Sequence, residues 1–219
     1  MSIESTDRVE GAESMRPAPP ADPFDAIVLA GGEGVRLGRV DKAAVVVGGR
    51  PMLEHALAAV AGARQLVVVG PAGLDSFGTA RVQEDPPLGG PVAGLDAGLT
   101  RLGPAGDVPV LVLACDMPLA APAVADLLAA LARAPAADGA ALVDAEGRRQ
   151  SLLAVYRREP LGAALDVLRA GGGVHGASMR RLLDGLVLVE VPDRTGAGQD
   201  ADTWEAVAWL EAVISERTP

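Results

Sequence analysis

From Asp25 onward the chain alternates short runs of valine and leucine with longer amphipathic stretches rich in alanine and leucine. This alternation is typical of repeated βα units, in which each strand is followed by a helix that covers the sheet. Aromatic residues make up only 2% of the chain, so the core has to be built from Ala, Val and Leu, which suits helices packed on a Val-rich parallel sheet. With 219 residues, 49% of them hydrophobic, the chain has enough apolar material for one α/β domain.

The apolar runs and the Gly, Pro and charged residues that bound them place the expected elements along the chain. We expect strands at residues 26–30, 65–69, 80–83, 108–115, 140–143, 152–157 and 186–191, and helices at 51–61, 91–102, 121–133, 160–169, 177–183 and 203–216. In open α/β sheets, ligands bind at the carboxyl ends of the strands, so the chemistry is expected there.

The residues up to about Pro23 differ from the rest of the chain. They are polar, acidic and rich in proline, and they show no periodic apolar pattern. We therefore expect a disordered leader at 1–23, followed by a single domain at 24–219.

Charge and cysteine content exclude several classes of protein. The formal net charge of -10 opposes nonspecific binding to DNA or RNA, although a local site can still hold a triphosphate. The only cysteine is Cys115, so no disulfide framework or cysteine zinc site is expected, and a cytoplasmic setting fits. No apolar run approaches the roughly 18 residues of a membrane-spanning helix. We expect no nucleic-acid or membrane partner, and a monomer or weak homo-oligomer.

The segment LAGGEGVRLGRVDK follows the first expected strand. Its four glycines remove side chains where a backbone has to wrap closely around a ligand: Gly31, Gly32, Gly34 and Gly38. Arg36 and Lys42 add a planar fork and a mobile point charge, both suited to phosphate oxygens. The glycine spacing misses the dinucleotide-binding fingerprint, and no Gly-Lys-Ser/Thr follows, so a polyphosphate site of another kind is indicated.

A second feature is VPVLVLACDMP, an apolar strand that ends in Asp116. A carboxylate at the edge of such a strand should be paired or should bind a cation, because an isolated buried charge is costly. Mg2+ binds through one or two carboxylates plus substrate phosphates, so Asp116 is the expected metal ligand. A helix cap at this residue is the alternative.

Between these features lies EDPPLGGPVAGLDAGL, where Gly89, Gly90 and Pro91 lead into a helix of small residues. The start of that helix can face an anion. A simple turn from strand to helix is the alternative for the two glycines.

The pattern L-A-G-G-x-G-x-R-x-G-x-x-D-K resembles the signature of the MobA-like nucleotidyltransferases. The resemblance implies a three-layer α/β/α fold with a mostly parallel sheet, of the Rossmann-like nucleotide-diphospho-sugar transferase (GT-A-like) kind. It implies nucleotide-binding roles for Leu29, Ala30, Gly31, Gly32, Arg36, Lys42, Asp85 and Asp116, with Lys42, Arg36 and Asp116 serving catalysis and Asp116 holding Mg2+. Asp41 also matches, to orient Lys42 or to cap the local turn.

If the resemblance extends to the substrates, the nucleotide is GTP, the acceptor is molybdopterin carrying molybdenum, and the product is its guanine dinucleotide. Some members carry asparagine where this chain has Gly70, so CTP stays an alternative. So do a sugar-phosphate or phospholactate acceptor and a nucleotide-binding protein without catalysis.

The carboxyl-terminal part matches the family more loosely. Arg148, Arg149 and Gln150 could face an anionic acceptor, and His175 lies in a glycine-rich turn where a structural role is the simpler interpretation. In QDADTWEAVAWL, Asp202 with Thr203 is expected to cap the last helix, and a second metal ligand is the alternative for Asp202.

Overall fold

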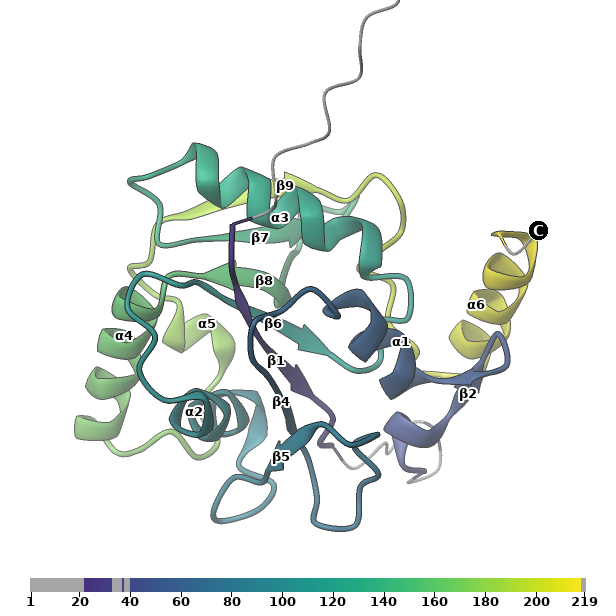
Figure 1. The fold of residues 1–219 in the computed structure, drawn as a ribbon, viewed down its shortest axis with the longest axis horizontal. Coiled ribbons are helices and arrows are strands. Elements are labelled where there is room, and N and C mark those ends of the chain that lie inside the picture. Colours follow the sequence, from purple (N-terminus) through teal and green to yellow (C-terminus); the bar gives the residue numbers. More distant parts are fainter. Residues whose placement is uncertain (1–21, 33–36, 38–39, 218–219) are drawn as a thin grey trace, which may run out of the picture.

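The computed structural model describes residues 22–32, 37 and 40–217, and they form a twisted sheet covered by helices on both faces (Figure 1). Most of the expected leader, residues 1–21, lies outside the described residues. The large sheet has the order β5-β4-β1-β6-β8-β7-β9. Its strands are β1 (Asp25–Leu29), β4 (Leu66–Val69), β5 (Ala80–Val82), β6 (Val110–Ala114), β7 (Gly139–Val143), β8 (Arg149–Tyr156) and β9 (Leu188–Pro192).

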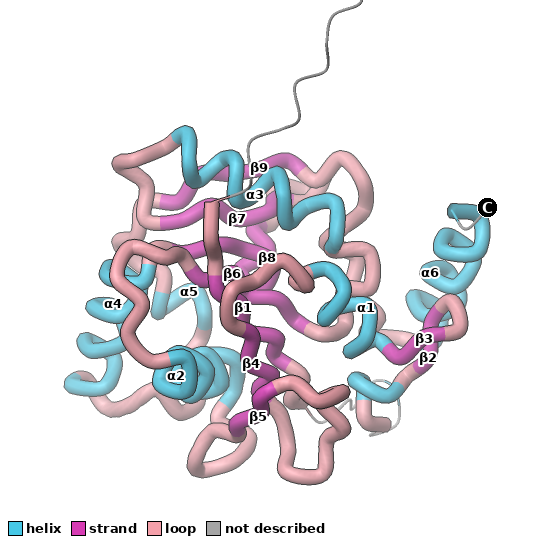
Figure 2. Tube along the Cα trace, in the orientation of Figure 1, coloured by secondary structure: helices cyan, strands magenta, loops and turns pink. Residues whose placement is uncertain are grey.

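Helices cover the two faces of this sheet and complete three layers, as Figure 2 also shows. One face packs against α1 (Met52–Ala59) and α3 (Ala121–Arg133). The other packs against α2 (Gly90–Leu102), α4 (Arg158–Ala170) and α5 (Met179–Leu182). In α4 the buried residues Leu161, Leu165 and Leu168 recur at helical spacing and form the stripe that meets the sheet. The expected three-layer α/β fold is confirmed.

The central strands β1 and β6 are buried along their whole length, because helices lie on both sides of them. This explains why both read as unbroken apolar runs in the sequence. They pair in parallel, from Asp25 beside Val110 to Leu29 beside Ala114, so their carboxyl ends lie at the same edge.

Strand β8 departs from the βα pattern, because it runs antiparallel to both β6 and β7. It follows β7 through a short turn at 144–148, and it begins at Arg149 rather than at the expected residue 152. The register shifts between Ala141 and Leu142, and the ladder then continues to Arg149 opposite Val143. The start of β8 therefore lies at the same edge as the ends of the parallel strands.

A smaller assembly stands at one side of the sheet, at the right of Figure 1. It contains the 3-10 helix η2 (Lys42–Ala44), the antiparallel pair β2 (Val46–Val47) and β3 (Arg50–Pro51), and α6 (Trp204–Arg217). A separate apolar cluster that includes Val47, Leu119 and Leu210 holds it together. Of these elements, only α6 is expected from the sequence.

Asp25 lies at the amino end of β1, at the edge of the sheet opposite the carboxyl ends of β1 and β6. Its side chain is fully buried. Its carboxylate accepts from Arg64 at 3.0 and 2.8 Å, from the backbone N–H of Gln65 at 3.1 Å and from Arg158 at 2.5 Å. The Arg158 guanidinium also donates to the carbonyl of Gly103 at 2.8 Å. These contacts join β1 to the residues before β4 and to the first residue of α4.

Candidate active site

A cavity of about 560 Å³ opens at the carboxyl edge of the sheet. The strand ends contribute Leu29, Val69 and Ala114, and the glycine loop contributes Gly31 and Gly32. The start of α2 adds further lining residues: Gly90, Pro91 and Gly94. Four charged residues of this wall come from separate parts of the chain: Lys42, Glu84, Asp116 and Asp202. This volume falls within the range of small-molecule sites, which run from about 300 to 1,000 Å³.

Lys42 lies between the two aspartates. Its Nζ donates to Asp116 Oδ2 at 3.0 Å and also to Asp202 Oδ1. Burial lowers the pKa of Lys42, but the hydrogen bonds and negative charges of Asp202 and Asp116 outweigh that effect and raise it above its ordinary value. The side chain therefore stays protonated and supplies a positive charge rather than acting as a base.

Lys42 is also the only lysine in the chain, whose 19 Lys and Arg residues are otherwise all arginine. It opens η2, and Asp41 caps that helix by accepting from the backbone N–H of Ala43 at 3.1 Å. The cap at Asp41 is thus confirmed. It fixes the backbone from which Lys42 reaches into the cavity.

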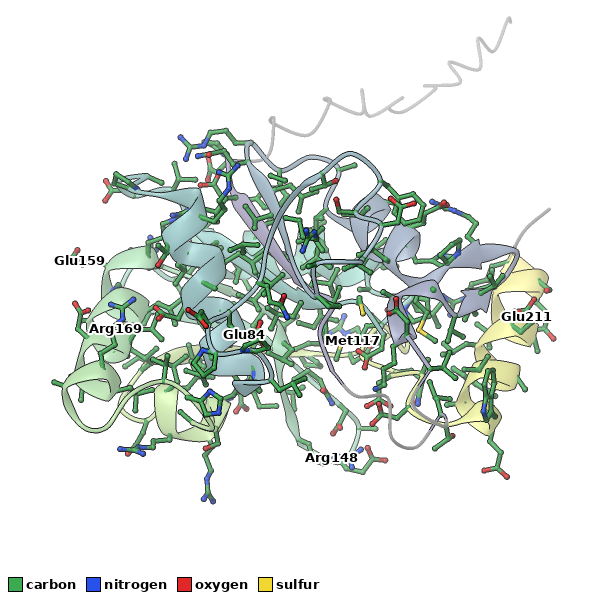
Figure 3. The ribbon with its side chains drawn as sticks, turned by 90° about the horizontal axis from the view of Figure 1, so that it is seen from below. Glu84, Met117, Arg148, Glu159, Arg169 and Glu211 are labelled. Atoms are coloured by element: carbon green, nitrogen blue, oxygen red, sulfur yellow. The ribbon has the colours of Figure 1, made fainter. Side chains whose placement is uncertain are left out.

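Asp116 follows β6, where Cys115 still donates its backbone N–H to the carbonyl of Leu29 at 2.9 Å. The alternative role as a helix cap fails for α3, because that helix begins at Ala121 and its cap position is Ala120. In Figure 3, which shows the molecule from below, Met117 beside Asp116 lies between Glu84 and Glu211.

Asp202 reaches the cavity from the segment before α6. The backbone N–H of Ala201 donates to the carbonyl of Asp116 at 2.9 Å, so the two acidic segments are joined through their main chains. Thr203 supplies the side-chain cap of α6, since its Oγ1 accepts from the backbone N–H of Ala206 at 3.2 Å. The side chain of Asp202 contacts Lys42, a contact that the sequence did not predict.

The two carboxylates define where a metal ion would fit. Within residues 22–32, 37 and 40–217, no group of three or more His, Cys, Asp or Glu side chains is placed to hold a metal. A pair is sufficient for Mg2+, which keeps waters and takes its remaining oxygens from substrate phosphates. Asp116 and Asp202 therefore fit a magnesium ion that arrives with a phosphate ligand.

Of the other residues expected to bind the nucleotide, two do not line the cavity and one lies outside the described residues. Ala30 is buried and donates its backbone N–H to Val69 at 2.7 Å. Asp85 is exposed, while its neighbour Glu84 lines the cavity and accepts from the backbone N–H of Leu88 at 3.0 Å. Arg36 lies outside the described residues. The sequence offered no signal that would have favoured Glu84 over Asp85.

The start of α2 contacts the glycine-rich turn that contains His175. Gly176 donates its backbone N–H to the carbonyl of Gly89 at 2.8 Å, and a Cβ placed on Gly89 would lie 3.0 Å from His175 Nδ1. Gly89 is therefore required for close packing. The contact supports a structural role for this turn.

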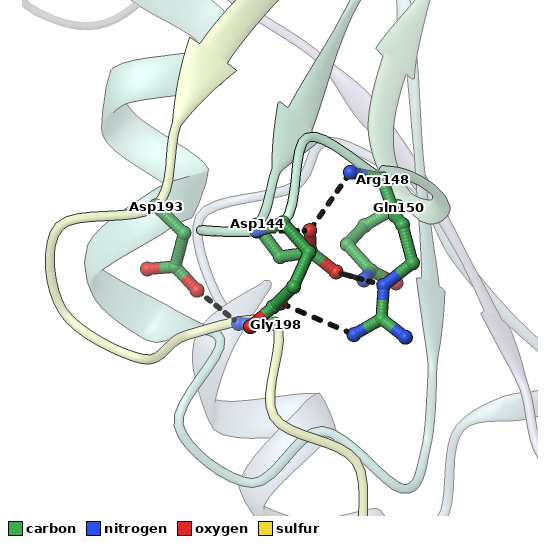
Figure 4. Close-up of polar contacts among 6 residues, drawn as sticks. Asp144, Arg148, Gln150, Asp193 and Gly198 are labelled. Carbon is green, nitrogen blue, oxygen red and sulfur yellow. Dashed lines mark hydrogen bonds and ion pairs between the residues drawn. The ribbon is translucent and has the colours of Figure 1, made fainter.

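The arginines expected near an acceptor are engaged in ion pairs. Arg148 donates to Asp144 at 2.8 Å, Gln150 donates to the same carboxylate at 3.1 Å, and Asp193 accepts from Gly198 nearby (Figure 4). Desolvation raises the pKa of Asp144, but the hydrogen bonds and charge of Arg148 outweigh it and lower the pKa overall. Arg149 pairs with Glu190 at 2.9 Å. These contacts stabilise the turn between β7 and β8, which brings Leu152 to the cavity.

Cys115 provides no nucleophile, although it lines the cavity. Its thiol is buried, and this burial, followed by the nearby charge of Asp116, raises its pKa far above the ordinary value. A thiol that stays protonated is a poor nucleophile, because the thiolate is the reactive form. The cavity is therefore arranged for binding and charge neutralisation.

Gly31 and Gly32, a lysine and two carboxylates line one cavity at the carboxyl edge of this sheet, an arrangement that fits a nucleotidyltransferase. The chain belongs to the MobA-like NTP transferase family, whose model matches residues 26–189. A relative from Acidiphilium cryptum (strain JF-5), named molybdenum cofactor guanylyltransferase, is 38% identical over 144 residues, which cover 64% of this chain and 68% of the relative. One of the same name from Cupriavidus pinatubonensis is 32% identical over 164 residues, covering 69% and 79% of the two chains.

Solved structures agree on the fold. Molybdopterin-guanine dinucleotide biosynthesis protein A from Archaeoglobus fulgidus superposes with a TM-score of 0.68 at 21% identity, covering 88% of this chain and all of that one (100%). The 2-C-methyl-D-erythritol 4-phosphate cytidylyltransferase of Thermus thermophilus gives 0.62 at 20% identity, with 88% and 99% covered. No helix among the described residues has the length and apolar character to cross a membrane.

Proposed function

We propose that this protein transfers GMP from GTP to molybdopterin carrying molybdenum, in a Mg2+-dependent reaction that yields the molybdopterin guanine dinucleotide and pyrophosphate. The observation that carries the proposal is the convergence of Lys42, Asp116 and Asp202 on a cavity that the glycine loop also lines. The names of the relatives support the choice of GTP and of the acceptor.

The reaction requires no protein nucleophile. An oxygen of the acceptor's terminal phosphate forms a bond to the α-phosphorus of GTP, and the bond from that phosphorus to the bridging oxygen of pyrophosphate breaks. Catalysis then rests on alignment and on neutralising charge, both of which a preorganised site supplies. This agrees with the protonated Cys115 in the cavity wall.

The residues of the site have separate parts in this proposal. Gly31 and Gly32 let the backbone approach the phosphates, and Lys42 and Arg36 stabilise the negative charge that develops on the transferring and departing groups. Asp116 and Asp202 would hold Mg2+, which when bound neutralises phosphate oxygens. The start of α2 at Gly90 faces the same cavity, and helix amino termini favour anions.

Base recognition does not use a side chain at residue 70. A Cβ at Gly70 would lie 2.6 Å from Leu74 Cδ2 and 3.2 Å from the carbonyl oxygen of Ala30, so a side chain at this position would require its neighbours to shift. We therefore expect guanine to be selected by main-chain groups or by other side chains of the cavity.

The test is to incubate the purified protein with Mg2+, molybdenum-loaded molybdopterin and each nucleoside triphosphate in turn, and to measure pyrophosphate release. Release with GTP alone supports the proposal. Release with CTP alone would make the protein a cytidylyltransferase, and no release with any triphosphate would refute this acceptor or the activity.

Asp116→Ala should lower Mg2+-dependent turnover by at least about 100-fold, because the charge-neutralising arrangement is lost. Asp126→Asn is the matched control, since it removes an exposed carboxylate of α3 with the same change in net charge. Circular dichroism establishes that both variants fold. Unchanged turnover in a folded Asp116→Ala protein would remove Asp116 from the mechanism.

A further inference from the structure

Lys42 lies where a cation bound to Asp116 and Asp202 would also lie. Its ammonium group donates to both carboxylates, and these residues are 74 and 160 positions away in the chain. An ammonium group has three donors and no acceptor, and both partners are the oxygen ligands that a divalent metal ion would use. Lysine and metal ion therefore share one binding place.

The carboxylates are fixed more firmly than the lysine. Asp116 lies two residues after the buried strand β6, and its carbonyl accepts a hydrogen bond of 2.9 Å from the backbone N–H of Ala201, the residue before Asp202. Ala201 itself is fully buried. Lys42 reaches the same point through a flexible four-carbon side chain. When a second cation competes for the pair, the lysine is the group that can move.

The charges explain why a cation is needed there. Two carboxylates and one ammonium group carry a net charge of one negative unit, whereas the carboxylates without the lysine would carry two at short range. Like charges close together in a partly buried place repel, and the ammonium group relieves that repulsion. Adding a divalent ion while the ammonium group stays in place would in turn bring like positive charges into contact.

We propose that Lys42 is a removable counter-ion, which neutralises Asp116 and Asp202 in the free protein and leaves them when a divalent metal ion enters together with a triphosphate. This rests on the proposed function in one respect, namely that the ligand is a triphosphate. The released ammonium group turns to the phosphates, because Lys42, Gly31 and Gly32 line the same cavity. A metal ion without a triphosphate binds weakly, because the ammonium group of Lys42 would lose Asp116 and Asp202 and find no phosphate to pair with instead.

The choice of lysine fits this role. Every other one of the 19 Lys and Arg residues is arginine, and the single lysine occupies the site. A guanidinium is a rigid planar fork that favours a fixed bidentate partner, whereas an ammonium group is a point charge that exchanges partners easily. A lysine that only bridged the segment before α6 to the segment after β6 would keep its position when metal ion and triphosphate bind.

The first experiment measures binding of Mn2+ alone to the full-length protein by electron paramagnetic resonance of the free ion. Lys42→Met should bind Mn2+ about tenfold more tightly than the unaltered protein, a difference of about 1.4 kcal/mol. Arg133→Met is the control, because it removes one positive charge from the exposed last turn of α3 and should leave Mn2+ affinity unchanged. Equal or weaker Mn2+ binding by folded Lys42→Met would overturn the proposal.

The second experiment uses the fact that the chain contains one lysine. Labelling with [ε-13C]lysine gives a single side-chain signal, which reports on Lys42 alone. The signal should change little with Mg2+ and shift strongly with Mg2+ plus a non-hydrolysable GTP analogue, at concentrations where calorimetry shows the analogue bound. An unmoved signal in that complex would refute displacement.

Neither experiment uses the acceptor or measures turnover. A protein that fails to transfer GMP can still show tighter Mn2+ binding in Lys42→Met, so this inference and the proposed function fail separately.

Discussion

Replacing Asp25 with asparagine tests whether the buried ion cluster at the amino end of β1 carries stability without serving the site. Asparagine keeps the size of the side chain but removes its charge. The two arginines that Asp25 pairs with then lose their carboxylate, and they differ in access to water: the side chain of Arg64 is 42% exposed and that of Arg158 only 10%. Arg64 can turn to solvent, whereas Arg158 stays enclosed with the carbonyl of Gly103 as its remaining partner.

Breaking a buried pair by removing one partner costs roughly 3–5 kcal/mol, and the freedom of Arg64 places this case at the lower end, about 3 kcal/mol. For a chain of this size, each kcal/mol shifts Tm by roughly 2–4 °C, so Tm should fall by roughly 6–12 °C. Nucleotide affinity should not change, because Asp25 and the cavity lie at opposite ends of β1.

The assay is urea unfolding followed by circular dichroism, with nucleotide binding measured by calorimetry on the same samples. Asp166→Asn is the control, since Asp166 is 71% exposed in its pair with Arg169 and should cost less than about 1 kcal/mol. A loss below about 1 kcal/mol in Asp25→Asn would refute the reasoning that an enclosed Arg158 depends on this carboxylate.

Three further outcomes are expected. Gly98→Ala should destabilise the protein by about 1–3 kcal/mol in thermal unfolding, because its Cβ would lie 2.9 Å from a methyl group of Ile27. Gly162→Ala is the control: a Cβ there meets open space, so this change should stabilise the protein by up to about 1 kcal/mol. Burial raises the pKa of Asp193, but hydrogen bonds from the backbone N–H groups of residues 195–198 outweigh it and lower the pKa below its ordinary value of 3.8. Urea titrations should therefore show the unaltered protein to be more stable than Asp193→Ala above pH 3.8, and this advantage should disappear as the pH falls through the lowered pKa of Asp193. Cys115 should resist a thiol reagent until denaturant exposes it, and rapid reaction of the native protein would contradict its buried, protonated state.

The sequence predicts the parts of this protein that depend on local pattern. Alternating apolar runs locate the strands and main helices, and the end of an apolar strand locates Asp116 at the cavity. The antiparallel direction of β8 does not follow from periodicity, yet a signal was present: the turn at 144–148 is too short for the crossover of a dozen or more residues that a parallel strand needs.

Other features depend on contacts between distant segments. The contact of Asp202 with Lys42 spans 160 positions, and a local helix cap was the simpler interpretation of an aspartate before a helix. The pair β2 and β3 consists of two-residue strands around Gly48 and Gly49, which is too short to show a period. Packing against α6, including Ile214 beside Gly48, stabilises that pair, and such packing is invisible in the local sequence.

The hydrogen bond from Ala201 to Asp116 bears on the order in which the parts of the site are synthesised, because Ala201 follows every strand of the sheet in the chain. The last strand of the sheet, β9, ends at Pro192, so a ribosome releases every strand and the glycine loop before it releases Ala201 and Asp202. A nascent chain can assemble the sheet while Lys42 still lacks one of its two carboxylate partners. The cavity therefore gains the carboxylate of Asp202 only when the segment before α6 has emerged, after every strand of the sheet.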